Sequence, residues 1–226
     1  MNRNSLLFIV IALVALAFPA RAVDYNAMQV EVTMHPDRYR ALLNRFVAGD
    51  TTLTSPELAM VYYGYSFTPD YDPRETFDQI TDAFDVKDYE QVARMTPDAL
   101  VVNPVSLDLS VMAFTAAERG AGERPGMRAA NLGLRCDMIA TAILESGRGT
   151  SPDSPFKVIS SADIGRLLRN VLGISVIVGR TKCGDVDAIK VTFPDSDRQH
   201  ILYFDNTREA MFLARRGASA ANNDKH

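Results

Sequence analysis

The sequence feature that most constrains the fold is a change of hydrophobic pattern at residues 147–152. This segment of Gly, Arg, Thr, Ser and Pro is rich in turn-forming residues. Before it, apolar residues recur with the spacing of amphipathic helices, and after it short β-branched runs are typical of strands. We therefore expect an α+β fold, with an N-terminal helical half of antiparallel helix hairpins followed by a small antiparallel sheet with one or two helices.

Local signals set the bounds of several predicted elements. Thr54 and Glu57 form a capping box in front of one helix, and Ser160 with Asp163 is placed to cap a later helix that Gly173 ends. Helical patterns cover residues 36–48, 54–64, 74–84, 87–95, 106–120, 126–145 and 161–172. Strand patterns cover residues 156–159, 174–178, 189–193 and 201–204, and a last short helix is expected over residues 208–214.

The N-terminus has the three parts of a secretory signal peptide. Arg3 lies in a polar start, Leu6 to Phe18 is an unbroken run of 13 apolar residues, and Pro19 precedes an A-x-A cleavage site that ends at Ala22. Such a run is shorter than the roughly 20 residues that span a bilayer. We expect cleavage after Ala22, a periplasmic or secreted product, and no stable membrane insertion after cleavage. The alternative is an uncleaved anchor.

The mature chain has the size and charge of an ordinary globular domain. We expect residues 23–216 to form a single α+β domain, with a helical part at about 36–146, a sheet part at about 155–214, and a disordered tail at 217–226. Without the leader, 22 basic residues face 28 acidic ones, a net charge of −6. This acidic balance argues against nucleic acid as a partner and against polybasic attachment to lipid.

Two cysteines remain in the mature chain. Cys136 falls on the apolar face of a predicted helix, and Cys183 lies in a turn between two predicted strands. An oxidising compartment would permit a disulfide between them, and the alternative is one buried thiol and one loop thiol that never meet. Without C-x-x-C spacing they do not indicate zinc, so we expect no metal site and no cofactor.

A cluster of tyrosines is the strongest candidate for a binding surface. Tyr62, Tyr63, Tyr65 and Tyr71 lie within ten residues of one another, and tyrosine is enriched in recognition surfaces. The alternative is that they form the core that joins the helical half to the following loop, with hydroxyls reaching water. Asp50, just before them, is a further binding candidate or a group that satisfies a helix end.

Catalytic groups are scarce. General acid–base chemistry usually needs a histidine, and Cys183 with His200 is a conceivable pair. No G-x-S-x-G motif is present, and the Asp pairs at 185/187 and 195/197 lack the further ligands of a calcium loop. We therefore expect no catalytic residues.

Several blocks of sequence, taken in order, are similar to one protein family. They are residues 45–54, 62–65 and 71–73 in the first half, and residues 143–151, 156–159, 172–173 and 203–205 in the second. Across roughly residues 36–210 the chain resembles an uncharacterised family of exported bacterial proteins, domain of unknown function 4919. The resemblance implies export and an α+β fold, and it carries no established activity.

Together these features favour a non-catalytic periplasmic binding or accessory module that holds a peptide, a glycan or an envelope protein. The alternative is a small envelope-directed hydrolase with an acidic site near Asp50 or Asp205. Convergence of Asp50, Asp185 and Asp205 with Tyr63 in one cleft would favour the hydrolase.

Overall fold

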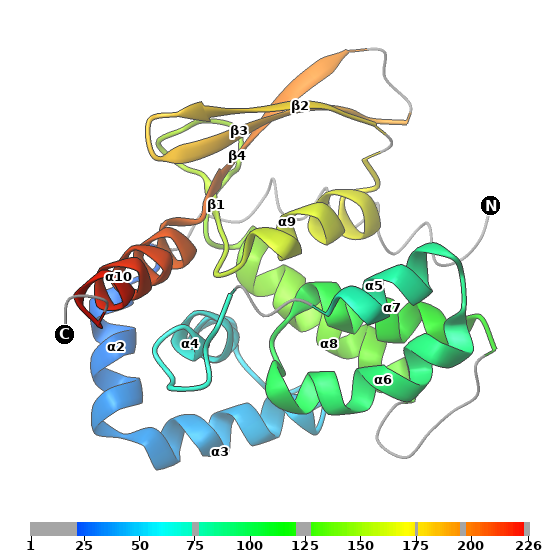
Figure 1. Cartoon of the computed structure of the whole chain (residues 1–226), viewed down its shortest axis with the longest axis horizontal. Coiled ribbons are helices and arrows are strands. Elements are labelled where there is room, and N and C mark those ends of the chain that lie inside the picture. The colour runs from blue at the N-terminus through cyan, green and yellow to red at the C-terminus, as the bar shows by residue number, and fades with distance from the viewer. Residues whose placement is uncertain (1–21, 74–76, 121–127, 175, 195–197, 224–226) are drawn as a thin grey trace.

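The structure is a computed structural model that describes residues 22–73, 77–120, 128–174, 176–194 and 198–223, with side chains as far as Arg216. The predicted signal peptide, apart from Ala22, lies outside the described residues, as does the last part of the predicted tail. The chain folds as a helical part followed by a small sheet and a terminal helix, as Figure 1 shows, so the α+β prediction is confirmed.

Packed helices make up the first part of the chain. The helices α3, α4, α7 and α8 begin and end within a few residues of the predicted bounds, whereas α2 was not predicted. The bounds are α2 Tyr25–Met34, α3 Pro36–Val47, α4 Ser55–Tyr65, α5 Asp78–Asp85, α6 Tyr89–Val102, α7 Leu107–Glu118 and α8 Ala129–Leu144.

The capping box at the start of α4 is present, and it is tied to the end of α3. The Thr54 backbone N–H donates to Glu57 Oε2 at 2.8 Å. Arg45 at the end of α3 donates to Glu57 Oε1 at 2.7 Å and to Asp50 Oδ2 at 2.8 Å. One guanidinium therefore holds the α3–α4 loop and the first turn of α4 together.

Helix α6 is longer than the sequence predicts because it continues through Pro97. The predicted end is residue 95, whereas α6 runs to Val102. A proline inside a helix costs about 3 kcal/mol because it removes a donor and crowds the preceding turn. Val92, Ala99 and Leu100, on both sides of Pro97, are buried in one cluster with α5 and α7, and this packing offsets the cost.

The second part is a four-stranded sheet in the order β1-β4-β3-β2. Its bounds are β1 Phe156–Lys157, α9 Ser161–Arg166, the π-helix η1 Leu167–Val171, β2 Val176–Cys183, β3 Val186–Thr192, β4 Gln199–Asp205 and α10 Thr207–Asn223. The prediction of a wholly antiparallel sheet is wrong, because β1 pairs parallel to β4, with Phe156 opposite Phe204. The predicted strand at residues 156–159 is too short for its apolar pattern to distinguish a parallel from an antiparallel strand.

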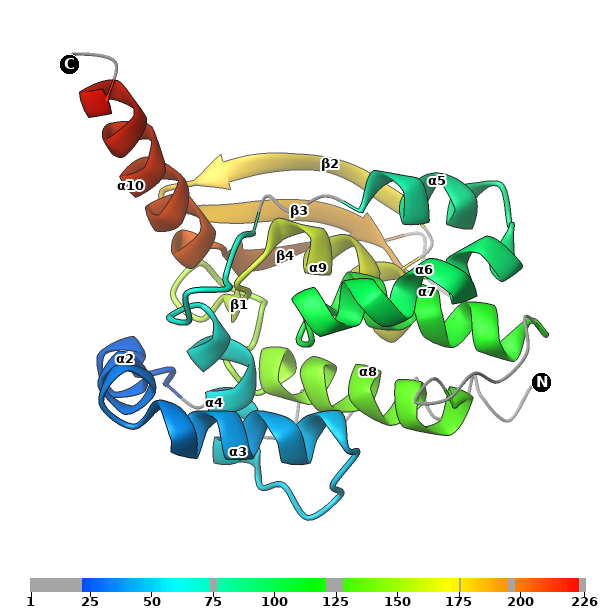
Figure 2. The same cartoon turned by 60° about the horizontal axis from the view of Figure 1, so that its bottom comes forward.

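The last helix also differs from the prediction. Helix α10 runs to Asn223, where the sequence predicts a helix end at Ala214 and disorder from residue 217 on. Gly217 costs a helix only about 1 kcal/mol, and the alanine-rich segment after it has high helix propensity. Figure 2 shows α10 projecting from the body of the protein.

One hydrophobic cluster joins the helices to the sheet. Tyr63 of α4, Ile139 of α8, Leu168 of η1 and Phe204 of β4 all belong to it. Helix α9 lies between the sheet and the helices α7 and α8 in both views (Figures 1 and 2). The helical and sheet parts therefore share their core.

The turn-rich segment that separates the two patterns is itself packed. A Cβ on Gly147 would lie 2.0 Å from the Pro155 carbonyl oxygen, and a Cβ on Gly149 would lie 2.1 Å from the Phe156 ring. Gly149 has φ +67° and its carbonyl accepts from the Tyr203 N–H at 2.8 Å. Glycine is required at both positions because any side chain would collide with the segment that leads into β1.

Candidate functional site

The structure places the tyrosine cluster in the core. Tyr62, Tyr63, Tyr65 and Tyr71 expose between 0% and 5% of their surface. They therefore cannot form the recognition surface that the sequence suggested. They are part of the core, which was the alternative interpretation. Their hydroxyls do not reach water, since they bond to groups of the protein.

These hydroxyls connect parts of the chain that are distant in sequence. Tyr63 Oη lies 3.1 Å from the Ala142 carbonyl oxygen and 3.0 Å from that of Lys157. Tyr71 Oη donates to the Ile159 carbonyl, and Tyr65 Oη donates to the Val102 carbonyl at 2.7 Å. Burial raises the pKa of the Tyr62, Tyr63 and Tyr71 hydroxyls, so each remains a neutral donor.

Asp163 is the centre of this buried network, and sequence reasoning misplaced it. Its Oδ2 accepts from the Tyr62 hydroxyl at 2.8 Å, and its Oδ1 accepts from the backbone N–H groups of Leu107 and Asp108 at 2.9 and 3.1 Å. It therefore caps α7, whereas the cap of α9, the helix in which Asp163 lies, is Ser160. Burial raises the pKa of Asp163 to about 7. A cap from 56 residues away leaves no local signal in the sequence.

The acidic residues proposed for a hydrolase do not converge. Asp50 is bound by Thr52 and Arg45, which hold its pKa at about 2. Asp205 ends β4, where it pairs with the Lys157 ammonium at 2.8 Å, and Asp185 is exposed in the β2–β3 turn. Only Asp205 lies near Tyr63, whose pKa its charge helps to raise. Asp50 is a structural anchor of the α3–α4 loop.

The two cysteines are free, so the disulfide considered from the sequence is not formed. Cys136 is buried in the middle of α8, whereas Cys183 is exposed where β2 meets its turn. Cys183 is also far from His200, because Cys183 pairs with Val186 at one end of β3 and His200 pairs with Val191 near the other. A Cys–His catalytic pair is therefore excluded. Among the described residues, no group of His, Cys, Asp or Glu has the arrangement of a metal site.

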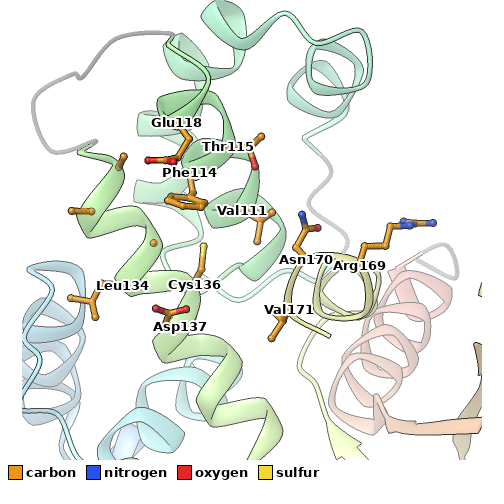
Figure 3. A pocket seen from close by; sticks show the side chains of 13 residues that line it. Val111, Phe114, Thr115, Glu118, Leu134, Cys136, Asp137, Arg169, Asn170 and Val171 are labelled. Atoms are coloured by element: carbon orange, nitrogen blue, oxygen red, sulfur yellow. The ribbon is translucent and has the colours of Figure 1, made fainter. Parts of the chain in front are cut away.

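A pocket of about 800 Å³ lies between α7, α8 and η1 (Figure 3). Most of its wall is apolar: Val111 and Phe114 come from α7, Ala130 and Leu134 from α8, and Val171 from η1. A smaller set of polar side chains completes the wall, namely Thr115, Glu118, Cys136, Asp137, Arg169 and Asn170.

Local sequence explains why a space remains between these helices. The α8 wall carries Ala129 and Ala130, each with a single methyl group, and Gly133, which has no side chain. A Cβ on Gly133 would lie 3.1 Å from the Phe114 ring, so this glycine lets the ring lie against α8. The third wall is the π-helix, in which the Leu172 N–H bonds to the Leu167 carbonyl at 2.9 Å. Such single π-turns are frequent at functional sites.

Two titratable groups of the pocket have shifted pKa values. Burial raises the pKa of the Cys136 thiol to about 12, so the thiol is neutral and a poor nucleophile at neutral pH. Burial also raises the pKa of the Asp137 carboxyl. Asp137 is half-buried and has no hydrogen-bond or ion-pair partner within the described part of the chain.

The sequence did not single out this pocket. It placed Cys136 on the buried face of a helix, which is correct, but Glu118, Asp137 and Arg169 carried no motif. The available signal was the small residues Ala129, Ala130 and Gly133, which share one face of a predicted helix. A helix face of small residues indicates either that a neighbouring helix packs closely against it or that a space remains beside it. Only the positions of α7 and η1 distinguish these two cases.

Comparison with protein families places the chain. Residues 28–211 match the family model described as "Domain of unknown function (DUF4919)". The chain belongs to the DUF4919 family. The matched region of this DUF4919 protein contains the whole pocket and the Asp163 network. Searches of curated proteins and of solved structures found no match.

One further finding concerns membranes. Within the residues that the structure describes, no helix is both long and apolar enough to cross a bilayer.

Proposed function

We propose that this DUF4919 protein is a non-catalytic binding protein that acts in the periplasm or outside the cell, and that the pocket between α7, α8 and η1 holds its ligand. The pocket carries the proposal. Its volume of about 800 Å³ falls within the range of small-molecule sites. Such sites are mostly apolar with a few polar groups that fix orientation, and this lining follows that pattern.

The chemistry of the pocket supports binding over catalysis. Its thiol has a raised pKa, and its lining includes no histidine within the described residues. A hydrolase needs a nucleophile beside a base with a pKa near the working pH. Asp50 and Asp205, which the hydrolase alternative required, are each bound to a cation elsewhere in the fold.

The leader supports action after export. Helix α2 begins at Tyr25, three residues after the expected cleavage point, so cleavage after Ala22 would leave every described helix intact. In that compartment we expect the ligand to be a small molecule, or the end of a peptide, a glycan or an envelope protein that fits the pocket.

Co-purified ligand tests the proposal. Ala130 lines the pocket and is exposed, so Ala130→Trp would fill the space without disturbing the core. Asn131→Trp is the matched control, because Asn131 is the next residue of α8, is exposed and does not line the pocket. We expect native mass spectrometry of protein from the envelope fraction to show bound mass in the wild type and in Asn131→Trp, and none in Ala130→Trp.

Bound mass that persists in Ala130→Trp would contradict this site. A protein that carries its leader and remains in the cytosol would contradict the expected compartment.

A further inference from the structure

The charges of the pocket are arranged asymmetrically. Asp137 lies on the α8 wall beside Cys136, and Glu118 lies on α7 (Figure 3). Among the described residues, the one cation of the lining is Arg169, which is exposed and extends away from both carboxyls in Figure 3. A molecule inside the pocket therefore meets the half-buried Asp137 carboxyl and, as far as the described lining goes, no cation that faces it.

The state of Asp137 is unfavourable without a ligand. A partly desolvated carboxyl without donors loses solvation and gains nothing in return, which is why its pKa is raised. Three other acids of the protein have the cation that Asp137 lacks among the described residues. Each has a positively charged nitrogen within 4 Å, and they are Asp50, Asp187 and Asp205. Asp137 lines a cavity that is large enough to admit a missing partner.

We propose that the ligand is an apolar molecule that carries one protonated amine, with the amine on Asp137 and the apolar body against Phe114, Val111 and Leu134. A charge-assisted hydrogen bond to a carboxylate is stronger than a neutral one, and desolvation strengthens it further. This inference rests on the proposed function, because it names the ligand class of the same pocket.

Three probes with one apolar body and different head groups test the charge. They are 4-phenylbutylamine, 4-phenylbutanol and 4-phenylbutyrate, which are a cation, a neutral alcohol and an anion at pH 7. Their dissociation constants for the full protein can be measured by calorimetry or ligand-observed NMR. We expect the amine to bind about tenfold more tightly than the alcohol, and the carboxylate to bind more weakly than either.

Two isosteric variants assign the preference to one side chain. Asp137→Asn keeps the shape and removes the charge, so the ratio of the alcohol and amine dissociation constants should fall from about ten to about one. Alcohol binding should change far less than amine binding, because the amide still exchanges a hydrogen bond with a neutral hydroxyl. Asp98→Asn is the control, because it changes the net charge equally at an exposed position of α6, outside the pocket lining. It should retain the preference.

The outcomes separate this inference from the proposed function. Equal binding of amine and alcohol to the wild type, or a preference that survives in Asp137→Asn, would overturn the amine inference and leave the pocket as a binding site. If no probe binds the wild type, or if all three bind Ala130→Trp as well as the wild type, both the amine inference and the pocket assignment are overturned.

Discussion

Asp163 and Asp137 are a buried and a half-buried carboxyl whose surroundings differ. Both have raised pKa values because of desolvation. Asp163 is fully enclosed and accepts three hydrogen bonds, whereas Asp137 lines a cavity and has no partner among the residues that the structure describes. Asp163 has a structural role, because its donors come from α4 and α7. Because Asp137 lines a pocket and Asp163 does not, Asp137 is the better candidate for a ligand-binding residue, although both are desolvated.

Removal of the Asp163 carboxyl should have the largest effect on stability. Asp163→Ala leaves the Leu107 and Asp108 N–H groups and the Tyr62 hydroxyl without their acceptor, which should lower the free energy of unfolding by about 4 kcal/mol. Urea unfolding followed by circular dichroism measures this. Tyr62→Phe removes one donor to Asp163 and the acceptor of the Ile159 N–H, and it should cost about 2 kcal/mol. A cost for Asp163→Ala as small as that of Tyr62→Phe would show that the cap on α7 is not needed.

The pH dependence of stability should carry the signature of Asp163. Its pKa is about 7 in the folded protein and 3.8 as a model value for the unfolded chain, so between these values the folded state holds a proton that the unfolded state releases. The free energy of unfolding should therefore fall as pH rises from about 4 to 7, by at most about 1.4 kcal/mol per pH unit. Asp163→Asn should lose this slope, and Asp50→Asn should retain it. A slope unchanged in Asp163→Asn would assign it to another group.

The smallest effect is expected at Asp137, with the opposite sign. Asp137→Leu replaces an unpartnered half-buried carboxyl with an apolar group of similar length, and it should raise the free energy of unfolding by about 0.5 kcal/mol. The corresponding shift of the melting temperature is roughly 2 °C. A loss of stability greater than 1 kcal/mol would mean that Asp137 has a structural role like that of Asp163.

The sequence predicted the elements whose signals are local. The apolar stripe that begins at Pro36 and the capping box at Thr54 give α3 and α4 within a few residues, because periodicity and caps act within one or two turns. The sequence predicts an end of α6 at residue 95, before Pro97. The helix continues because the packing that offsets the proline comes from α5 and α7. The direction of β1 was wrong for the same reason, because its partner Phe204 lies 48 residues further on.

The candidate site was harder to predict than the fold. The tyrosines attracted attention because of their type and their clustering, yet a core and a recognition surface use the same side chain, and only burial distinguishes them. Asp137 carried no motif. Its interest comes from its place in the pocket between α7, α8 and η1, where no described residue is its partner. Cys136 was correctly placed on a buried face, but the space beside it was not foreseeable.

The packed glycine segment at the boundary between the two patterns has a consequence for engineering. Loops between differently patterned regions usually tolerate insertions, nicking and circular permutation. Here a side chain at Gly147 or Gly149 would collide with the chain that leads into β1, and the Gly149 carbonyl is bonded to β4. A tag or new terminus belongs instead at the β2–β3 turn, where a Cβ on Gly184 meets no atom within 4 Å. The segment at residues 147–152 therefore packs the two halves against each other. A truncation or a domain exchange should keep both halves together.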